Sequence, residues 1–142
     1  MTFSVKTSSF EMQTAGFGDI LDITRQVAKG VSGSGLSDGT ATVFVPGSTA
    51  GITTIEYEPG AVEDLKKAIE RQASANLHYA HDARWGDGNG FSHVRAALMG
   101  ASLTIPFTRG ELQLGTWQQI VLCDFDNRAR KREVLVQAMG VE

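Results

Sequence analysis

The three histidines of the chain stand close together, because His78, His81 and His93 fall within a window of sixteen residues. Imidazole titrates near neutral pH and is a common ligand of transition metals, so the cluster predicts acid–base chemistry or a metal site. The alternative is an ordinary polar loop, since no HExxH or similar ligand spacing is present. Spacing alone leaves both interpretations open.

A glycine-rich stretch, Asp87–Gly90, leads directly into a predicted helix that carries His93 and Arg95. Backbone N–H groups at a helix N-terminus, approached through glycines and supported by a cation, can hold phosphate or pyrophosphate. We therefore expect an anion site there. The alternative is a glycine-rich turn with an ordinary helix cap.

Three further segments carry polar groups. The turn Pro46–Gly51 contains Ser48 and Thr49, whose hydroxyls and amides can hydrogen-bond to a ligand. Its glycines are equally consistent with a turn that only connects two strands. Glu56 follows in an otherwise apolar segment and is either a solvent-facing residue or a buried base or ligand; periodicity favours solvent. The basic run Arg128–Arg132 is expected to be a solvated edge at a hairpin tip.

Composition limits the classes of function. Sixteen acidic and thirteen basic residues give a net charge of −3 over 142 residues, which argues against general nucleic-acid binding. No apolar run reaches the roughly 20 residues of a membrane span, and the start lacks the apolar stretch of a secretory signal, so we expect a cytoplasmic protein without a membrane partner. Cys123 is the single cysteine, which excludes an intrachain disulfide and a cysteine-based zinc site.

The elements needed to position these residues form one domain over 1–142. Strands at both ends with helices between them, without regular alternation, predict an α+β fold with a mostly antiparallel sheet and two or three helices. Residues 75–92 are expected to be a loop. We expect strands at 2–12, 40–45, 51–57, 102–107, 112–114, 116–126 and 130–139, and helices at 22–31, from 59 onward, and at 92–99.

Five motifs resemble the YjbQ-like family, often named secondary thiamine-phosphate synthase. They are PGSTAGITTIEYEPG (46–60), HYAHD (78–82), DGNGFSHVRAALMGASLTIPF (87–107), GELQLGTWQQIVLCDFD (110–126) and the following RARKREV (128–134). The resemblance covers nearly the whole chain. It implies a compact α+β fold, a homotrimer with a polar pocket near a subunit boundary, and condensation of hydroxymethylpyrimidine diphosphate with thiazole phosphate, releasing pyrophosphate.

The resemblance also implies roles for particular residues. His81, His93 and Glu56 would be catalytic groups or ligands of a divalent metal, zinc or magnesium, while Gly47 stands where many relatives carry a further histidine. His78 has no matching position. The implied substrate-binding residues are Ser48, Thr49, Asn89, Gly90 and Arg95.

Two other functions remain open from the sequence. One is a metal-assisted hydrolase of a small phosphorylated or acyl substrate, with His81 and His93 holding the metal. The other is a non-catalytic trimeric protein that binds a small ligand. All of these require His81, His93 and Glu56 to meet at one point beside exposed backbone donors.

Overall fold

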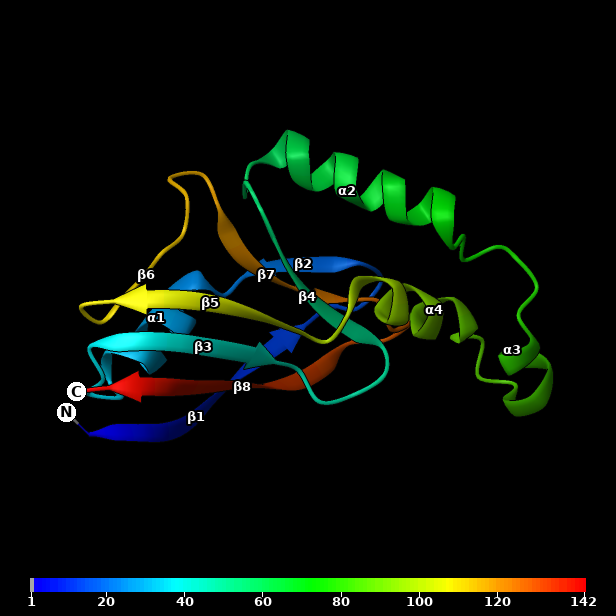
Figure 1. Ribbon diagram of the computed structural model, residues 1–142. Helices are drawn as coiled ribbons and strands as arrows, with labels where there is room; N and C mark the ends of the chain where they lie inside the picture. Colours follow the sequence, from blue (N-terminus) through cyan, green and yellow to red (C-terminus); the bar gives the residue numbers. More distant parts are fainter. Residues whose placement is uncertain (1) are drawn as a thin grey trace.

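Two antiparallel sheets form the framework of the protein in the computed structural model, which describes residues 2–142 (Figure 1). In the five-stranded sheet the spatial order is β1 (Phe3–Thr14), β8 (Arg130–Val141), β3 (Asp38–Phe44), β5 (Ser102–Thr108) and β6 (Glu111–Leu112). In the three-stranded sheet the order is β2 (Asp19–Asp22), β7 (Gln119–Asp124) and β4 (Ala50–Ile55).

Four helices complete the described part of the chain: α1 (Thr24–Ser32), α2 (Pro59–Gln72), α3 (Ala80–Trp85) and α4 (Gly90–Met99). The helix α2 begins where Pro59 supplies a fixed φ and the Glu58 carboxylate accepts hydrogen bonds from the first free amides, Gly60 N and Ala61 N. Among residues 2–142, no helix combines the length and the hydrophobicity needed to cross a membrane.

The main hydrophobic core lies between the two sheets. Helix α1 contributes Val27 and Val31, both fully buried, to this core. Alternating residues of most strands point into it, as the two-residue period of a strand requires. The buried strand residues in this core are Ala41, Val43, Ala50, Ile52, Ile105, Phe107, Ile120, Leu122, Val134, Val136 and Ala138.

Strand β7 separates this core from a second one. Ile120 and Leu122 face the main core, whereas Val121, Cys123 and Phe125 face a smaller cluster packed under α2 and α4. Burial on both faces explains why this segment is a continuous apolar run rather than an alternating one. The run ends at Asp124 and Asp126, which are buried at the same edge of the sheet.

The α+β class and the antiparallel pairing predicted from the sequence are confirmed, but the number of helices was underestimated. The structure has a helix, α3, inside the segment expected to be a loop, and a short strand, β2, that no pattern indicated. Helix α4 begins at Gly90 instead of Ser92, because Ser92 is fully buried and its hydroxyl donates to the Asn89 carbonyl at 2.6 Å.

Candidate functional site

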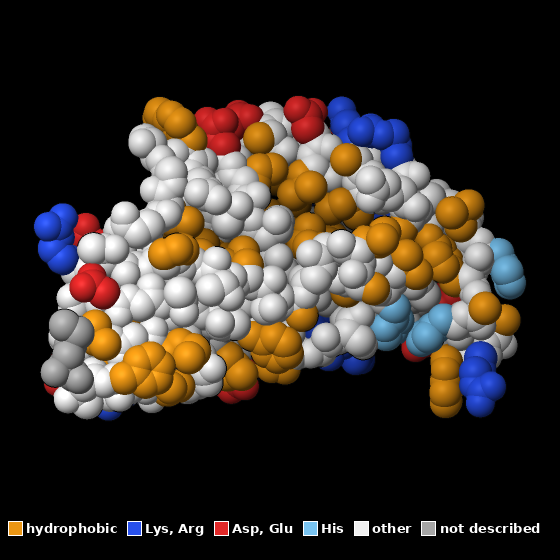
Figure 2. Space-filling model, in the orientation of Figure 1, with side chains coloured by type: hydrophobic (Ala, Val, Ile, Leu, Met, Phe, Trp, Pro, Cys, Tyr) orange, Lys and Arg blue, Asp and Glu red, His pale blue; other side chains and the backbone are white. Residues whose placement is uncertain are grey.

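A polar pocket of about 440 Å³ lies where the turn before β4, helices α3 and α4, and the start of β8 meet. Figure 2 shows the histidine side chains gathered at this end of the molecule. We call this depression the polar pocket. It is lined by Gly47, Ser48, Thr49, His81, Trp85, Asp87, Asn89, His93, Asp126, Arg130 and Arg132.

Two of the three histidines form a pair at the pocket wall. The rings of His81, on α3, and His93, on α4, have centroids 4.4 Å apart and are tilted by 38°. His81 Nδ1 lies 3.5 Å from Asp82 Oδ1 and 3.3 Å from Asp87 Oδ1, is buried, and has no hydrogen-bond partner among residues 2–142. A ring nitrogen and two carboxylates therefore converge on one point.

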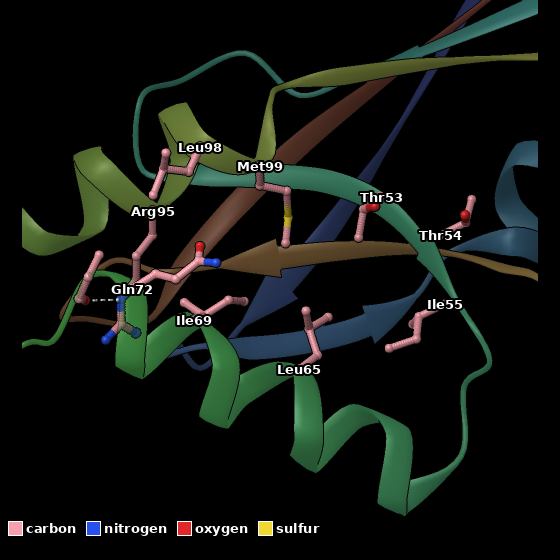
Figure 3. Close-up of a pocket in the computed structure, with 10 residues that line it drawn as sticks. Thr53, Thr54, Ile55, Leu65, Ile69, Gln72, Arg95, Leu98 and Met99 are labelled. Atoms are coloured by element: carbon pink, nitrogen blue, oxygen red, sulfur yellow. Dashed lines mark hydrogen bonds between the residues drawn. The ribbon is translucent and has the colours of Figure 1, made fainter.

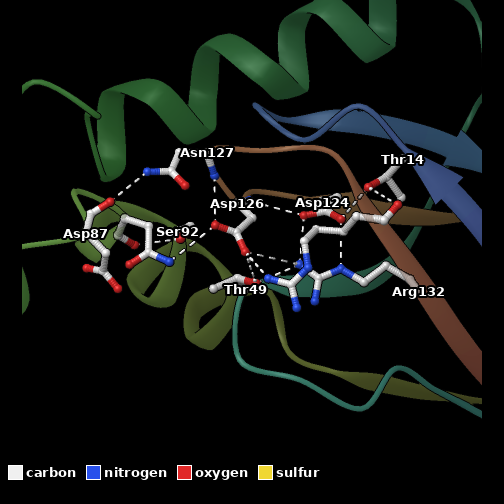
Figure 4. Close-up of polar contacts among 10 residues, drawn as sticks. Thr14, Thr49, Asp87, Ser92, Asp124, Asp126, Asn127 and Arg132 are labelled. Atoms are coloured by element: carbon white, nitrogen blue, oxygen red, sulfur yellow. Dashed lines mark hydrogen bonds and ion pairs between the residues drawn. The ribbon is translucent and has the colours of Figure 1, made fainter. Parts of the chain in front are cut away.

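The floor of the pocket contains a buried ion pair. Arg132 is 4% exposed, and its Nε and Nη2 donate to the two oxygens of the fully buried Asp124 at 2.7 and 2.8 Å (Figure 4). Thr14 Oγ1 also donates to Asp124, at 2.6 Å. Burial favours the neutral acid, but the hydrogen bonds from Arg132 and Thr14 outweigh it and hold the pKa of Asp124 below its usual value.

A second buried carboxylate, Asp126, accepts hydrogen bonds from three segments of the pocket: the turn before β4, the start of α4 and the start of β8. It accepts hydrogen bonds from Thr49 Oγ1 and Asn89 Nδ2, both at 3.2 Å, and from Arg130 Nη1 at 2.6 Å. Burial alone would raise the pKa of Asp126, yet the donation from Asn89, the Asn127 amide and Thr49, together with the Arg130 charge, lowers it. Asp126 is thus ionised at neutral pH and fixes the pocket walls relative to one another.

A separate, more apolar depression of about 340 Å³ lies between α2, α4 and the outer face of β4 (Figure 3). We call it the α2–α4 groove. Its lining includes Ile55, Leu65, Ile69, Leu98 and Met99, with Arg95 at one end. This groove contains neither of the paired histidines.

Arg95 is the first predicted site residue that the structure places elsewhere. Its side chain points away from the polar pocket: Nε donates to the Ala73 carbonyl at 2.9 Å, Nη2 pairs with Glu70, and the guanidinium lies 4.9 Å from the centre of the Phe91 ring. A hydrogen bond from Ser74, followed by those from Arg95 and the backbone, lowers the pKa of Glu70. Contrary to the prediction, Arg95 therefore does not line the polar pocket with His81 and His93, because its Nε and Nη2 donate to Ala73, which follows α2, and to Glu70 within α2.

Glu56 also lies away from the imidazole pair within one chain. It is exposed and follows the far end of β4, whereas Thr49 precedes the near end at the pocket. Six strand residues at about 3.3 Å each separate the two ends by about 20 Å. A single chain therefore does not bring Glu56 to His81 and His93.

Some of the other predicted site residues line the polar pocket and others do not. Ser48, Thr49 and Asn89 line the polar pocket as predicted, and His78 is exposed outside it. The amide of Gly90 is not free for a ligand, because it donates to Asp82 Oδ1 at 2.8 Å. This bond anchors the glycine-rich stretch to α3 instead of leaving it as a phosphate cradle.

Sequence reasoning missed the charged residues of the pocket floor, above all Arg132. The interpretation of Arg128–Arg132 as a solvated edge is wrong for Arg132, which is buried. A signal was available, because Arg130 and Arg132 share the two-residue period of Val134, Val136 and Ala138, all on the core face of β8. Asp82 and Asp87 also lie among the histidines in the sequence, but no role was predicted for their carboxylates.

Comparison with known proteins identifies close relatives. A family model described as UPF0047 protein YjbQ-like matches residues 8–141. A UPF0047 protein of Archaeoglobus fulgidus is 36% identical over 128 residues, covering 90% of this chain and 97% of that protein. The UPF0047 protein YugU of Bacillus subtilis is 33% identical over 133 residues, covering 93% and 98%.

Solved structures agree with the sequence matches. A YbjQ-like protein of unknown function from Sulfolobus solfataricus superposes with a TM-score of 0.93 at 32% identity, covering 98% of this chain and 99% of that one. A YjbQ/UPF0047 family protein from Clostridium acetobutylicum gives a TM-score of 0.84 at 37% identity, covering 92% and 98%.

These names correct one expectation from the resemblance. The relatives are named for the family and for no activity, so the assignment of thiamine-phosphate synthase activity to this chain is wrong: nothing in the matches carries it. The family itself was predicted correctly. The extent of the model match and the identity of the relatives establish that the chain belongs to the YjbQ-like UPF0047 family.

Proposed function

We propose that the polar pocket is a divalent-metal centre that binds a small phosphorylated molecule. The observation that carries this proposal is His81 Nδ1, a buried ring nitrogen without a hydrogen-bond partner that faces two carboxylates. A ring nitrogen and two carboxylate oxygens that face one point form a donor set that a metal cation can join.

The donor set suits such an ion. Ligand atoms of His81, Asp82 and Asp87 lie within 4.8 Å of one another, and mixed nitrogen and oxygen ligands are typical of zinc and manganese sites. In this proposal Asp87 is the acidic ligand, the role that the family resemblance implied for Glu56. The bound metal would supply positive charge that polarises a phosphoryl oxygen.

The remaining pocket residues would position the ligand. His93 lies beside His81 and is the group placed to exchange a proton with a bound molecule. Ser48 is exposed at the opposite wall and offers a hydroxyl. The homotrimer remains a proposal here, and a second copy of the chain is the route by which Glu56 would come near a pocket of this kind.

The test is metal binding by isothermal titration calorimetry, with Zn²⁺, Mn²⁺ and Mg²⁺ titrated into protein stripped with EDTA. We expect one ion per chain, with zinc or manganese bound more tightly than magnesium because a nitrogen ligand is present. His81→Ala and Asp87→Asn are expected to weaken binding at least about tenfold each, the typical loss for a removed ligand or its support.

His78→Ala is the matched control, because His78 is an exposed histidine outside the pocket. It should bind metal as the wild-type protein does. Binding that survives His81→Ala, or that is lost equally in His78→Ala, would contradict the proposed centre. The melting temperature of each variant shows whether a loss of binding reflects a loss of fold.

A further inference from the structure

The guanidinium of Arg132 has one nitrogen that the protein itself does not use. Nε and Nη2 donate to Asp124, and Nη2 donates in addition to Thr49 Oγ1 at 2.6 Å. No hydrogen bond from Nη1 to residues 2–142 is present, although 96% of the side chain is buried and the residue lines the polar pocket. Two N–H donors of a buried, fixed cation are therefore available at the pocket floor.

Gly47 leaves room beside this nitrogen. Its φ is +126°, a conformation that side-chain-bearing residues rarely adopt, and a Cβ at this position would stand 3.2 Å from Arg132 Nη1. Most residues would thus fill part of the space that Nη1 faces. The glycine keeps the floor open in front of the free donors.

The neighbouring carboxylates do not compete for these donors. Each oxygen of Asp124 and of Asp126 already accepts two hydrogen bonds, from Thr14, Thr49, Asn89, the two arginines and the backbone amides of Asp126 and Asn127. Their lone pairs are directed to the protein. The free groups of Arg132 are N–H donors, which suit an anion, while Asn89 Oδ1 in the same lining is a buried acceptor without a partner among residues 2–142.

We infer that Arg132 Nη1, beside Gly47 and Ser48, forms the subsite for the phosphoryl group of the ligand. The inference rests on the proposed function for the presence of a ligand, and it adds the atom that recognises the ligand's charge. A guanidinium held rigid by Asp124 makes short, charge-assisted bonds to phosphoryl oxygens without first losing side-chain entropy. Arg132 therefore takes the phosphate-binding role that was predicted for Arg95.

The experiment titrates inorganic phosphate into the protein in the presence of EDTA, at constant ionic strength set with chloride. Phosphate is expected to shift the side-chain NMR signals of Arg132. This measurement uses the wild-type protein and does not depend on the folding of any variant. In parallel, Arg132→Lys, which keeps the charge but lacks Nη1, should bind phosphate about tenfold or more weakly.

Gly47→Ala is the second variant, because it fills the space before Nη1 while leaving the Arg132–Asp124 pair intact. It should also weaken phosphate binding. Arg128→Gln removes a cation from the same basic run outside the pocket and is expected to bind phosphate as the wild type does. Unfolding curves confirm that each variant compared is folded.

Two results would overturn the subsite: no change in the Arg132 signals at saturating phosphate, or phosphate affinity unchanged in folded Gly47→Ala and Arg132→Lys. Zinc titration of the same variants separates the two proposals. Zinc binding without phosphate binding would leave the metal centre and remove the subsite. Phosphate binding in a wild-type protein that binds none of the three metal ions would leave the subsite and remove the metal centre.

Discussion

Two buried arginines, Arg132 in the polar pocket and Arg95 at the α2–α4 groove, show how similar side chains come to serve different purposes. Both are nearly inaccessible, at 4% and 8% exposure. Arg95 binds a backbone carbonyl, a half-exposed glutamate and an aromatic ring, and it connects α4 to α2. Arg132 is held by a fully buried carboxylate and still presents a nitrogen to a cavity.

The difference lies in what holds each guanidinium. Glu70 has a side chain 48% exposed to solvent, so its ion pair is screened and contributes little stability. Asp124 is fully buried, so its pair with Arg132 is sensitive to the loss of either partner. Arg132 is therefore held more firmly than Arg95, and burial by itself does not distinguish the two.

The largest effect is expected from Asp124→Ala. Removing this carboxylate leaves Arg132 buried without its main partner, which typically costs about 3–5 kcal/mol of unfolding free energy. Glu70→Ala, the matched change for Arg95, should cost less than about 1 kcal/mol because that pair is partly exposed. Urea denaturation of both variants measures the contrast, and equal losses would show that the two arginines are held in equivalent ways.

The next effect concerns pH. The folded pKa values of Asp124 and Asp126 lie below the ordinary aspartate value of 3.8. Such groups contribute stability that is complete above the unfolded pKa and is lost as pH falls through the lower folded values. The free energy of unfolding should therefore decline below about pH 4, and less steeply in Asp124→Ala. Urea unfolding from pH 7 to pH 2 measures both slopes; parallel curves would argue against an ionised Asp124.

A smaller effect is expected from Arg95→Met. This change removes the bonds to Ala73 and Glu70 but keeps an apolar side chain against Phe91, so we expect a loss of about 1–2 kcal/mol in stability. Phosphate and zinc affinities should stay within about twofold of wild type, because Arg95 does not line the polar pocket. A marked loss of phosphate affinity in the folded variant would show that Arg95 takes part in phosphate binding.

The least perturbing probe is Cys123, on the groove side of β7. Burial, aided by the charge of Asp19, raises the pKa of its thiol to about 12. At pH 8 the thiolate population is therefore very small, and we expect almost no reaction with a disulfide reagent until denaturant is added. Rapid labelling of the native protein would instead indicate that α2 and α4 open readily from β7.

Most of the framework was predictable because it rests on local patterns. The alternation of β8 and the helical spacing of Val62, Leu65 and Ile69 in α2 were visible in the sequence, and both elements are present. Helix α3 was not predictable in this way, because none of its six residues is buried and the helix ends at Gly86, whose φ is +72°. It is held by a hydrogen bond from the Gly90 amide to Asp82 Oδ1.

The site was harder to predict than the fold. His81 and His93 were paired correctly because they lie close in sequence, and the pocket turn with Ser48 and Thr49 was found from its residue types. Arg132 and Asp124 depend on the pairing of strands distant in sequence, which no local pattern reports. Glu56 was assigned through family resemblance, and its position depends on the length of β4.

The pairing of β1 with β8 has a consequence for biosynthesis. These strands match from Phe3 opposite Val141 to Thr14 opposite Arg130, and they lie side by side in Figure 1. Since β8 also sits between β1 and β3, the larger sheet lacks an interior strand until the ribosome has made almost all of these residues. Arg130 and Arg132 belong to that strand, so the polar pocket is complete only when translation of these residues finishes.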